Sequence, residues 1–339
     1  MNEYKPLTMS DIARLAGVSE STVSRALRDN PIINAKTRKK VQQIARDHHY
    51  QINESARNLR LNKSHTIAVV MLLDPACGQA ISDPFLLDLL GNVADELTKN
   101  GYDLLLSTTQ VLGEDLSPRY LDSKRADGMI IIGQGAQGQQ IDALAGSRKP
   151  FVVWGADRPG QSYATVGSDN KKGAYLAVRH LIDTGRRRIA FLGDSRHPEI
   201  EQRLAGYHQA LAEAGLTPDT ALQVESDFSS QSGYEATRDG LLAPGRSFDA
   251  IFTVSDAIAM GAIKLLGEKG VRVPEEVAVS GFDDIPTSAY CTPSLTTVRQ
   301  NTISLTSGPG LFYRWSEKSY PPDGGLLRRQ CRQPASRRP

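Results

Sequence analysis

Seven short apolar runs alternate with amphipathic segments along this 339-residue chain, and they restrict its fold more than any other feature. Segments such as residues 84–101 and 174–185 carry apolar residues at helical spacing between the runs. This order predicts parallel sheets covered by helices on both faces, with ligands bound beyond the carboxyl ends of the strands. The strands are expected at residues 66–73, 103–108, 128–133, 150–155, 188–193, 249–254 and 277–282.

A second feature is the run MSDIARLAGVSESTVSRAL at residues 9–27, which predicts two short amphipathic helices joined by a tight turn. Thr8 is expected to cap the first helix, and Ser19 is expected to cap the second. Gly17 lies between them and can adopt the positive φ that a reversal of the chain requires. The apolar residues expected on the buried faces are Ile12, Ala13, Ala16, Val23, Ala26 and Leu27.

The outward face of the second helix is short, polar and able to form hydrogen bonds, which suits the major groove of DNA. A surface helix pair that binds no ligand would have a similar pattern, so the charge of the surrounding residues is needed to distinguish it from a DNA-binding pair. Residues 1–62 contain eleven Lys and Arg against six Asp and Glu, a surplus of five, whereas the whole chain has a formal net charge of +2. A third helix is expected to open at residues 37–40, TRKK. Positive charge is therefore concentrated where phosphate attraction requires it.

The runs TMSDIARLAGVSESTVSRAL and KTRKKVQQIARDHHYQINESARNLR resemble the head and hinge of the LacI family of bacterial transcription regulators, and the resemblance continues to about Leu305. It implies an α/β protein with a helix-turn-helix DNA-binding head, a hinge helix and a two-lobed core of parallel sheets like that of periplasmic binding proteins. The implied domains are the head and hinge at 1–62, an effector-binding and dimerisation core at 63–305 and an atypical tail at 306–339. The implied N-lobe spans about 63–166 plus 294–305, and the C-lobe about 167–293.

By this resemblance, Glu20, Ser21 and Arg25 occupy base-reading positions. A carboxylate can only accept from bases, so Glu20 either narrows specificity or faces solvent. In the hinge helix, Leu59 is expected to wedge between base pairs in the minor groove, the alternative being an ordinary linker leucine. Candidates for phosphate contacts are Thr8, Ser19, Thr22, Ser24, Asn34 and Thr37, and further hinge positions that match the family are Asn53, Ala56 and Arg57.

The resemblance also places effector contacts in the core. Carboxylates, an arginine and aromatic faces suit a polyhydroxylated ligand, so a sugar or glycoside is favoured over a nucleobase or a phosphorylated sugar. For Arg203 the alternative is a surface salt bridge. For Asp169, a helix N-cap is favoured over a place beside the ligand. The implied effector residues are Phe85, His197, Arg203, Phe228, Asp256, Asp283 and Gln300.

A two-state mechanism follows from the resemblance. Two hinge helices dock on DNA only when the lobes hold them at the right separation, and an effector changes that separation. Because family operators are near-palindromes, a homodimer on double-stranded DNA is expected. A repressor released by its effector is favoured, although the sequence leaves open whether the effector releases or promotes DNA binding.

Other classes of protein fit less well. The adjacent carboxylates Asp283 and Asp284 should point apart, unlike the opposed pair of a glycoside hydrolase. The sequence has no Gly-x-Ser-x-Gly, no metal-ligand pattern and no Gly-x-Gly-x-x-Gly after the first strand, so we expect no catalytic residue, metal or cofactor. A solute-binding protein would need a signal peptide and would have no use for the head. The segment MNEYKPLTMS lacks signal-peptide order, and no apolar run could span a membrane, which predicts a cytoplasmic protein.

Residues 307–339 depart from the family pattern. They contain five Pro, four Gly and seven Lys and Arg against two acids, without apolar periodicity. A different reading frame or a disrupted end is one interpretation, and a natural basic tail with nonspecific DNA affinity is the other. A disrupted end would leave apolar surface and a sheet edge uncovered in the lobes. The three cysteines are odd in number and far apart, which favours reduced thiols at Cys77, Cys291 and Cys331.

Overall fold

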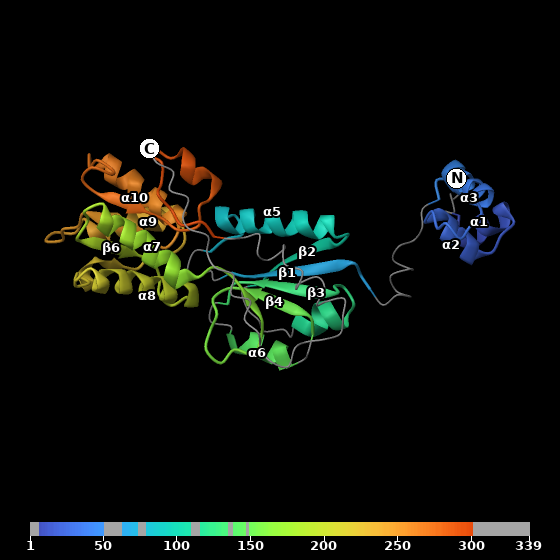
Figure 1. The fold of residues 1–339 in the computed structure, drawn as a ribbon, viewed down its shortest axis with the longest axis horizontal. Coiled ribbons are helices and arrows are strands. Elements are labelled where there is room, and N and C mark those ends of the chain that lie inside the picture. Colours follow the sequence, from blue (N-terminus) through green and yellow to red (C-terminus); the bar gives the residue numbers. More distant parts are fainter. Residues whose placement is uncertain are drawn as a thin grey trace, which may run out of the picture. The chain divides into compact units, whose positions relative to one another are not determined.

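The computed structural model describes residues 7–50, 63–73, 79–109, 116–134, 138–146 and 149–300. The chain divides into two compact units, Met1–Ser64 and His65–Pro339, which are called the head and the core below (Figure 1). Within the described ranges, no helix is both long and apolar enough to cross a membrane. Several expectations fall outside these ranges, namely those on Asn53, Ala56, Arg57, Leu59, Cys77, Cys331 and every residue after 300.

The first two helices of the head confirm the predicted hairpin. Thr8 and Asp11 form a capping box, in which each side chain accepts a hydrogen bond from the other residue's backbone N–H. Gly17 has a φ of 69°, in the left-handed region that favours glycine, and the chain reverses there. Ser19 then caps the second helix. The helices are α1 (Met9–Ala16), α2 (Glu20–Leu27) and α3 (Ala35–Asp47).

The third helix holds the hairpin together and begins earlier than expected. Asn34 caps it by accepting a hydrogen bond from Lys36 N at 2.8 Å, so α3 opens two residues before Thr37. The Lys40 ammonium donates to the carbonyl of Ala16 at 2.9 Å, which satisfies a backbone acceptor at the end of α1. One apolar cluster joins the three helices and contains Ile12, Ala13, Ala16, Val23, Ala26 and Val41.

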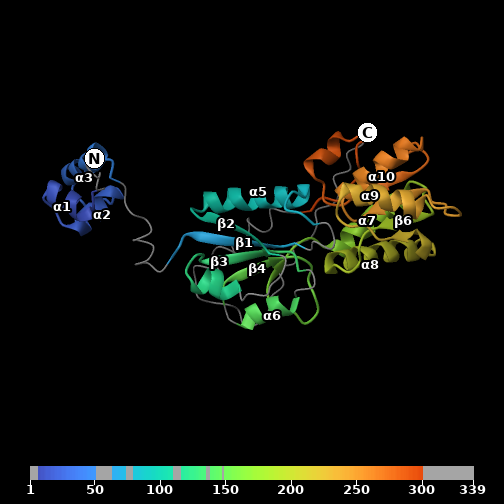
Figure 2. The same ribbon diagram turned by 180° about the vertical axis from the view of Figure 1, so that it is seen from behind.

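The N-lobe of the core is a five-stranded parallel sheet with helices on both faces. The strand order is β2-β1-β3-β4-β5. In Figure 1 and Figure 2, α5 (Pro84–Lys99) covers one face and α6 (Gly138–Gly146) lies on the other. Alternate residues of β1 point to opposite faces, so Val69 packs with α5 and Val70 packs with α6. The strands are β1 (Thr66–Leu72), β2 (Asp103–Thr109), β3 (Gly128–Ile132), β4 (Phe151–Trp154) and β5 (Thr165–Val166), and a π-helical segment spans Ser117–Asp122.

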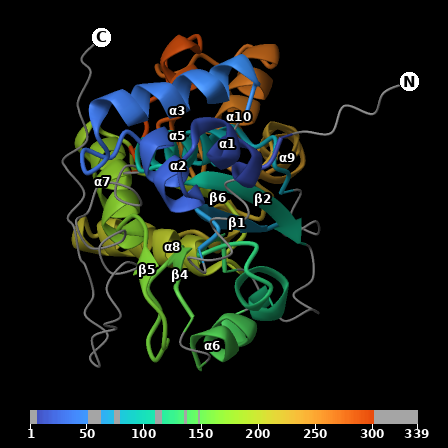
Figure 3. The ribbon, with the colours of Figure 1, turned by 90° about the vertical axis from the view of Figure 1, so that its right-hand side faces the viewer.

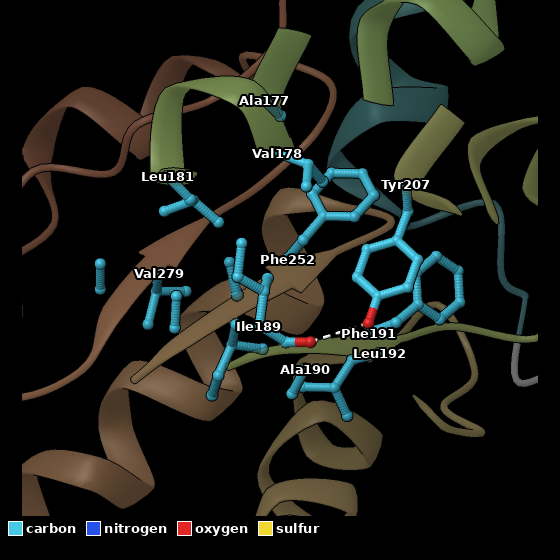
Figure 4. Close-up of a cluster of buried hydrophobic side chains, with 14 of the residues drawn as sticks. Ala177, Val178, Leu181, Ile189, Ala190, Phe191, Leu192, Tyr207, Phe252 and Val279 are labelled. Atoms are coloured by element: carbon cyan, nitrogen blue, oxygen red, sulfur yellow. Dashed lines mark hydrogen bonds between the residues drawn. The ribbon is translucent and has the colours of Figure 1, made fainter. Parts of the chain in front are cut away.

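The C-lobe is a four-stranded parallel sheet in the order β7-β6-β8-β9. Figure 4 shows its core, where the Tyr207 hydroxyl donates to the carbonyl of Ile189 at 2.8 Å, so the buried phenol keeps a partner. The strands are β6 (Ile189–Leu192), β7 (Gln223–Val224), β8 (Ala250–Thr253) and β9 (Ala278–Ser280). The helices are α7 (Asn170–Asp183), α8 (Pro198–Glu213), α9 (Ser230–Glu235) and α10 (Asp256–Glu268), with short 3-10 or π-helical turns at Thr220–Leu222, Ala236–Leu241 and Pro286–Tyr290.

All seven predicted strands are present, which confirms the parallel α/β fold. Two further strands were not expected, β5 and β7, and each is only two residues long. Such short segments carry no readable alternation, and they are strands only because they pair with β4 and β6. Figure 3 shows β5 beside β4.

The described part of the segment 294–305 packs differently from what the resemblance implies. The resemblance places this segment in the N-lobe, but Leu295 and Val298 lie in the apolar core of the C-lobe. The backbone N–H of Asp283 donates to the carbonyl of Val298 at 2.8 Å, so this segment runs alongside the chain that follows β9. The described part of the segment, up to residue 300, therefore extends the C-lobe.

Candidate functional site

The exposed side of α2 carries the three predicted base-reading residues, Glu20, Ser21 and Arg25. Ser19 Oγ lies 2.9 Å from both Ser21 Oγ and Thr22 Oγ1, so the hydroxyls of the first turn form one hydrogen-bonded group. Within the described residues, the side chain of Arg25 makes no hydrogen bond or ion pair. Its guanidinium is therefore available to an external acceptor.

Three of the predicted phosphate contacts lie at helix N-termini: Thr8 at α1, Ser19 at α2 and Asn34 at α3. Free backbone N–H groups and the helix dipole favour anions at such positions. At Ser24, the carbonyl accepts a hydrogen bond from Arg28 Nε at 2.9 Å, and the hydroxyl accepts from the same guanidinium. The two remaining predicted contacts are half-buried side chains, Thr22 and Thr37.

The core contains a cavity between its lobes that opens to solvent. The strand order reverses between β1 and β3 in one sheet and between β6 and β8 in the other, and ligands bind at the carboxyl ends of strands at such points. Leu73 after β1, Gln134 after β3 and Ser255 after β8 all line the cavity.

The cavity brings together six of the seven predicted effector residues. Two aromatic pairs are among its lining residues. In the C-lobe, His197 packs edge to face on Phe228 with 5.2 Å between the ring centres, and in the N-lobe the ring centres of Phe85 and Trp154 are 6.4 Å apart. Flat apolar faces of this kind suit a ring-shaped ligand. The six predicted residues that line the cavity are Phe85, His197, Arg203, Phe228, Asp283 and Gln300.

Arg203 is the central charged group of the cavity. Its side chain is only 6% exposed, so the alternative of a surface salt bridge is wrong. Nε donates to Asn170 Oδ1 at 2.9 Å, Nη1 donates to the carbonyl of Val254, and the guanidinium carbon lies 3.7 Å from the centre of the Phe282 ring. Burial lowers the pKa of Arg203, while the charge of Asp283 opposes that shift. The guanidinium remains charged because arginine is effectively always protonated in proteins.

Asp283 connects this arginine to the chain that passes between the lobes. Its Oδ1 lies 3.9 Å from Arg203 Nη1 and accepts a hydrogen bond from Gln300 Nε2 at 2.7 Å. Ser168, located between β5 and α7, donates to Gln300 Oε1 at 2.9 Å. Burial raises the pKa of Asp283 well above its ordinary value, although Arg203 lowers it. Asp283 also has a φ of 123°, a strained conformation for a residue with a side chain.

Asp256, the seventh predicted effector residue, does not line the cavity. Its buried carboxylate is engaged inside the C-lobe, where Oδ2 accepts from Ile285 N at 3.0 Å and Oδ1 accepts from Thr297 Oγ1 at 2.5 Å. The preceding residue, Ser255, caps α10 and lines the cavity instead. Asp169 caps α7 as predicted, accepting from a first-turn backbone N–H at 3.0 Å.

Replacing Asp256 by asparagine is expected to flatten the pH dependence of core stability. Burial raises the pKa of Asp256 from 3.8 to about 7, so between these values the folded protein holds a proton that the unfolded chain has lost. The free energy of unfolding therefore falls as pH rises through this window, by up to roughly 1.4 kcal/mol per pH unit. Asparagine keeps the shape and one acceptor oxygen without the charge. Urea unfolding at pH 5 and pH 8 should show a smaller difference for the variant, and equal pH dependence would contradict this assignment.

Several further lining residues lie outside the predicted effector set, and they follow a common positional pattern. Each lies at a strand end, within two residues after it or in the first turn of a helix. In that region the sequence offers many polar side chains, and only the fold selects those that face the cavity. The residues are Gln134, Trp154, Asn170, Glu199 and Ser255.

The head and core match known families separately. Residues 8–53 match the bacterial regulatory proteins of the lacI family, and residues 178–307 match the periplasmic binding protein-like domain. The HTH-type transcriptional regulator MalR of Clostridium butyricum is 33% identical over 302 residues, covering 87% of this chain and 88% of MalR. The HTH-type transcriptional repressor PurR of Pasteurella multocida (strain Pm70) is 32% identical over 321 residues, covering 92% and 93%.

Solved structures agree with this result. The Lac repressor dimer bound to operator and the anti-inducer ONPF superimposes with a TM-score of 0.80 at 26% identity, covering 92% of this chain and 93% of that one. The complex of the transcriptional regulator CelR with cellobiose gives a TM-score of 0.65 at 29% identity, covering 93% and 94%. The helix-turn-helix head and two-lobed core define a transcriptional regulator and not an enzyme. The chain belongs to the LacI family of bacterial regulatory proteins.

Proposed function

We propose that this regulator is a repressor that binds a near-palindromic operator as a homodimer and changes its operator affinity when a sugar or glycoside occupies the core cavity. The observation that carries the proposal is the convergence of Arg203, Asp283 and two aromatic pairs on one cavity. Hydrogen-bonding groups beside flat apolar faces suit the hydroxyls and the ring of a sugar. A nucleobase or a phosphorylated sugar is the alternative ligand.

Two of the similar proteins support parts of this proposal. One solved neighbour is a repressor dimer on its operator, and another is a regulator in complex with cellobiose. In this chain the contacts with the effector would come from the six cavity residues Phe85, His197, Arg203, Phe228, Asp283 and Gln300, together with Ser255 in the place expected for Asp256.

The DNA contacts are proposed residue by residue. Glu20, Ser21 and Arg25 would read bases from α2, and Leu59 in the hinge would wedge into the minor groove. The phosphate contacts would be Thr8, Ser19, Thr22, Ser24, Asn34 and Thr37, and the remaining hinge contacts would be Asn53, Ala56 and Arg57. The implied boundary near residue 62 would separate these contacts from the core.

Fluorescence anisotropy tests the proposed function. A palindromic duplex selected from random DNA is titrated with the full chain, with and without a panel of sugars and glycosides. Tight, selective binding that one sugar shifts is the expected result. Selective binding that only a nucleobase or a phosphorylated sugar shifts would support the alternative ligand, and absence of selective binding would contradict the proposal.

Replacing Arg25 by alanine is expected to weaken operator binding by roughly 10- to 100-fold, because a bidentate contact between arginine and guanine contributes about 1–3 kcal/mol of discrimination. Arg25 is exposed and has no partner within the described residues, so the head should stay folded. Arg46→Ala is the matched control, since it removes the same charge from the exposed side of α3. Equal losses for the two variants, measured by anisotropy at one salt concentration, would show that Arg25 contributes only charge.

A further inference from the structure

The charged groups around the cavity are unevenly balanced. Among the described residues, those that line the cavity contribute one guanidinium, from Arg203, and three carboxyl groups, from Asp83, Glu199 and Asp283. That guanidinium already lies 3.9 Å from Asp283 Oδ1, and Glu199 also contributes a favourable charge interaction to it. Arginine binds phosphate best with a free pair of parallel N–H groups and an unbalanced charge. Here the positive charge is already balanced by the protein.

Two of the three carboxyl groups are committed to internal contacts. Asp83 Oδ1 accepts a hydrogen bond from Leu86 N at 3.0 Å and caps α5, and Asp283 Oδ1 accepts from Gln300. Burial raises the pKa of both groups, although the charge of Arg203 lowers that of Asp283. The remaining carboxylate, that of Glu199, is therefore the one most available to contact a ligand.

Glu199 is half-buried in the first turn of α8 and reaches from the C-lobe to the N-lobe. Its Oε1 accepts a hydrogen bond from Ala156 N at 3.3 Å, and the same N–H lies 3.1 Å from Gln134 Oε1. Its Oε2 has no hydrogen-bond partner in the part of the chain that the structure describes. Gln134 alone can accept the hydrogen bond from the Ala156 N–H. A ligand hydroxyl can therefore replace this N–H as the hydrogen-bond partner of Glu199 without leaving a buried donor unpaired.

We propose that Glu199 makes the cavity selective for uncharged ligands that donate hydroxyl groups, such as unmodified sugars, and excludes phosphorylated and carboxylated ones. A carboxylate accepts two O–H donors, whereas a phosphate group offers mainly acceptors and brings a second negative charge. The proposal rests on the proposed function, since it names the ligand class of the same cavity.

Quenching of Trp154 fluorescence tests this charge selectivity without a known ligand. Trp154 lines the cavity, and Trp315→Phe leaves it as the single tryptophan of the chain. In this background, the quenchers are anionic iodide, cationic caesium and neutral acrylamide. We expect iodide to quench about threefold less well than caesium, and Glu199→Gln to raise the iodide constant about twofold, because a local negative charge repels anions and attracts cations.

Glu201→Gln is the matched control, because this exposed residue lies on the same helix and does not line the cavity. It should leave the iodide and caesium constants unchanged. Equal quenching by iodide and caesium, or equal effects of the two substitutions, would overturn the proposal. Acrylamide reports access independently of charge, so an altered acrylamide constant would identify a change of structure and count against the role assigned to Glu199.

Ligand pairs separate this proposal from the proposed function. Thermal shifts are measured for maltose, cellobiose and glucose beside the 6-phosphate of each sugar. Only neutral members should raise the melting temperature, and a phosphate ester that stabilises the protein more than its parent sugar would overturn the charge selectivity. If iodide is excluded as expected but no sugar alters operator binding, the selectivity stands and the assignment of a sugar effector fails.

Discussion

Replacing Gly261 by alanine should lower the free energy of unfolding of the core by about 3 kcal/mol, at the upper end of the usual cost of overpacking. A Cβ at this position would lie 1.9 Å from the carbonyl oxygen of Ser230 and 2.7 Å from the backbone N of Tyr234. Both neighbours are backbone atoms of α9, so a rotamer change cannot relieve the clash. Since Gly261 lies in α10, the helices α9 and α10 must separate, which disturbs their packing on the C-lobe sheet.

Gly267, which also lies in α10, provides the matched control. Nothing lies within 4 Å of a Cβ at Gly267, and its φ is not positive. Gly267→Ala should therefore change stability by less than about 1 kcal/mol, in the stabilising direction, because alanine has the higher helix propensity. Urea unfolding of the full chain, followed by circular dichroism, compares the two variants. Similar losses for both would show that close contact between α9 and α10 is not what requires Gly261.

Replacing Arg203 by methionine should cost about 3 kcal/mol of stability at pH 8, because breaking a buried ion pair leaves an uncompensated charge. Asp283 would lose its counter-charge, and Asn170 Oδ1 and the carbonyl of Val254 would lose their donor. The loss should be smaller at pH 5. Burial already raises the pKa of Asp283, and removal of Arg203 raises it further, so the carboxyl group accepts a proton more readily as pH falls.

A double-mutant cycle isolates this pair. Asp283→Asn removes the charge but keeps an acceptor for Gln300, so the variant with both substitutions should be more stable at pH 8 than the sum of the single losses predicts. The measurement is urea unfolding of the four proteins at pH 5 and pH 8. Strict additivity at pH 8 would show that the two side chains, although 3.9 Å apart, do not interact energetically.

The local elements of this protein could be predicted because their signals lie within a few residues. Thr8 and Ser19 cap helices whose first turns follow them at once, and Gly17 supplies the only turn that brings those helices together. The seven apolar runs likewise became strands, since a buried parallel strand needs little more than a short continuous apolar segment. Where a signal was ambiguous by two residues, as at the start of α3, the structure corrected it.

The candidate site could be predicted only in part. Six positions taken from the family resemblance do line the cavity, whereas Asp256 turns into the C-lobe and Ser255 takes its place. No local pattern shows which of these two neighbouring side chains faces the cavity. That depends on where α10 starts and on which loop lies within hydrogen-bond distance of Asp256. The carboxylate of Glu199 was missed for the same reason.

By itself, the sequence determined the helix-turn-helix head, the parallel α/β core and the concentration of positive charge in the head, since each depends on neighbouring residues or on composition. The tertiary structure alone decided the edge strands β5 and β7, the place of residues 294–300 in the C-lobe and the contacts of the cavity. Arg203 meets the Val254 carbonyl across 51 positions, and Ser168 meets Gln300 across 132. Contacts at such separations arise from the packing of whole lobes, for which no short segment of sequence carries a signal.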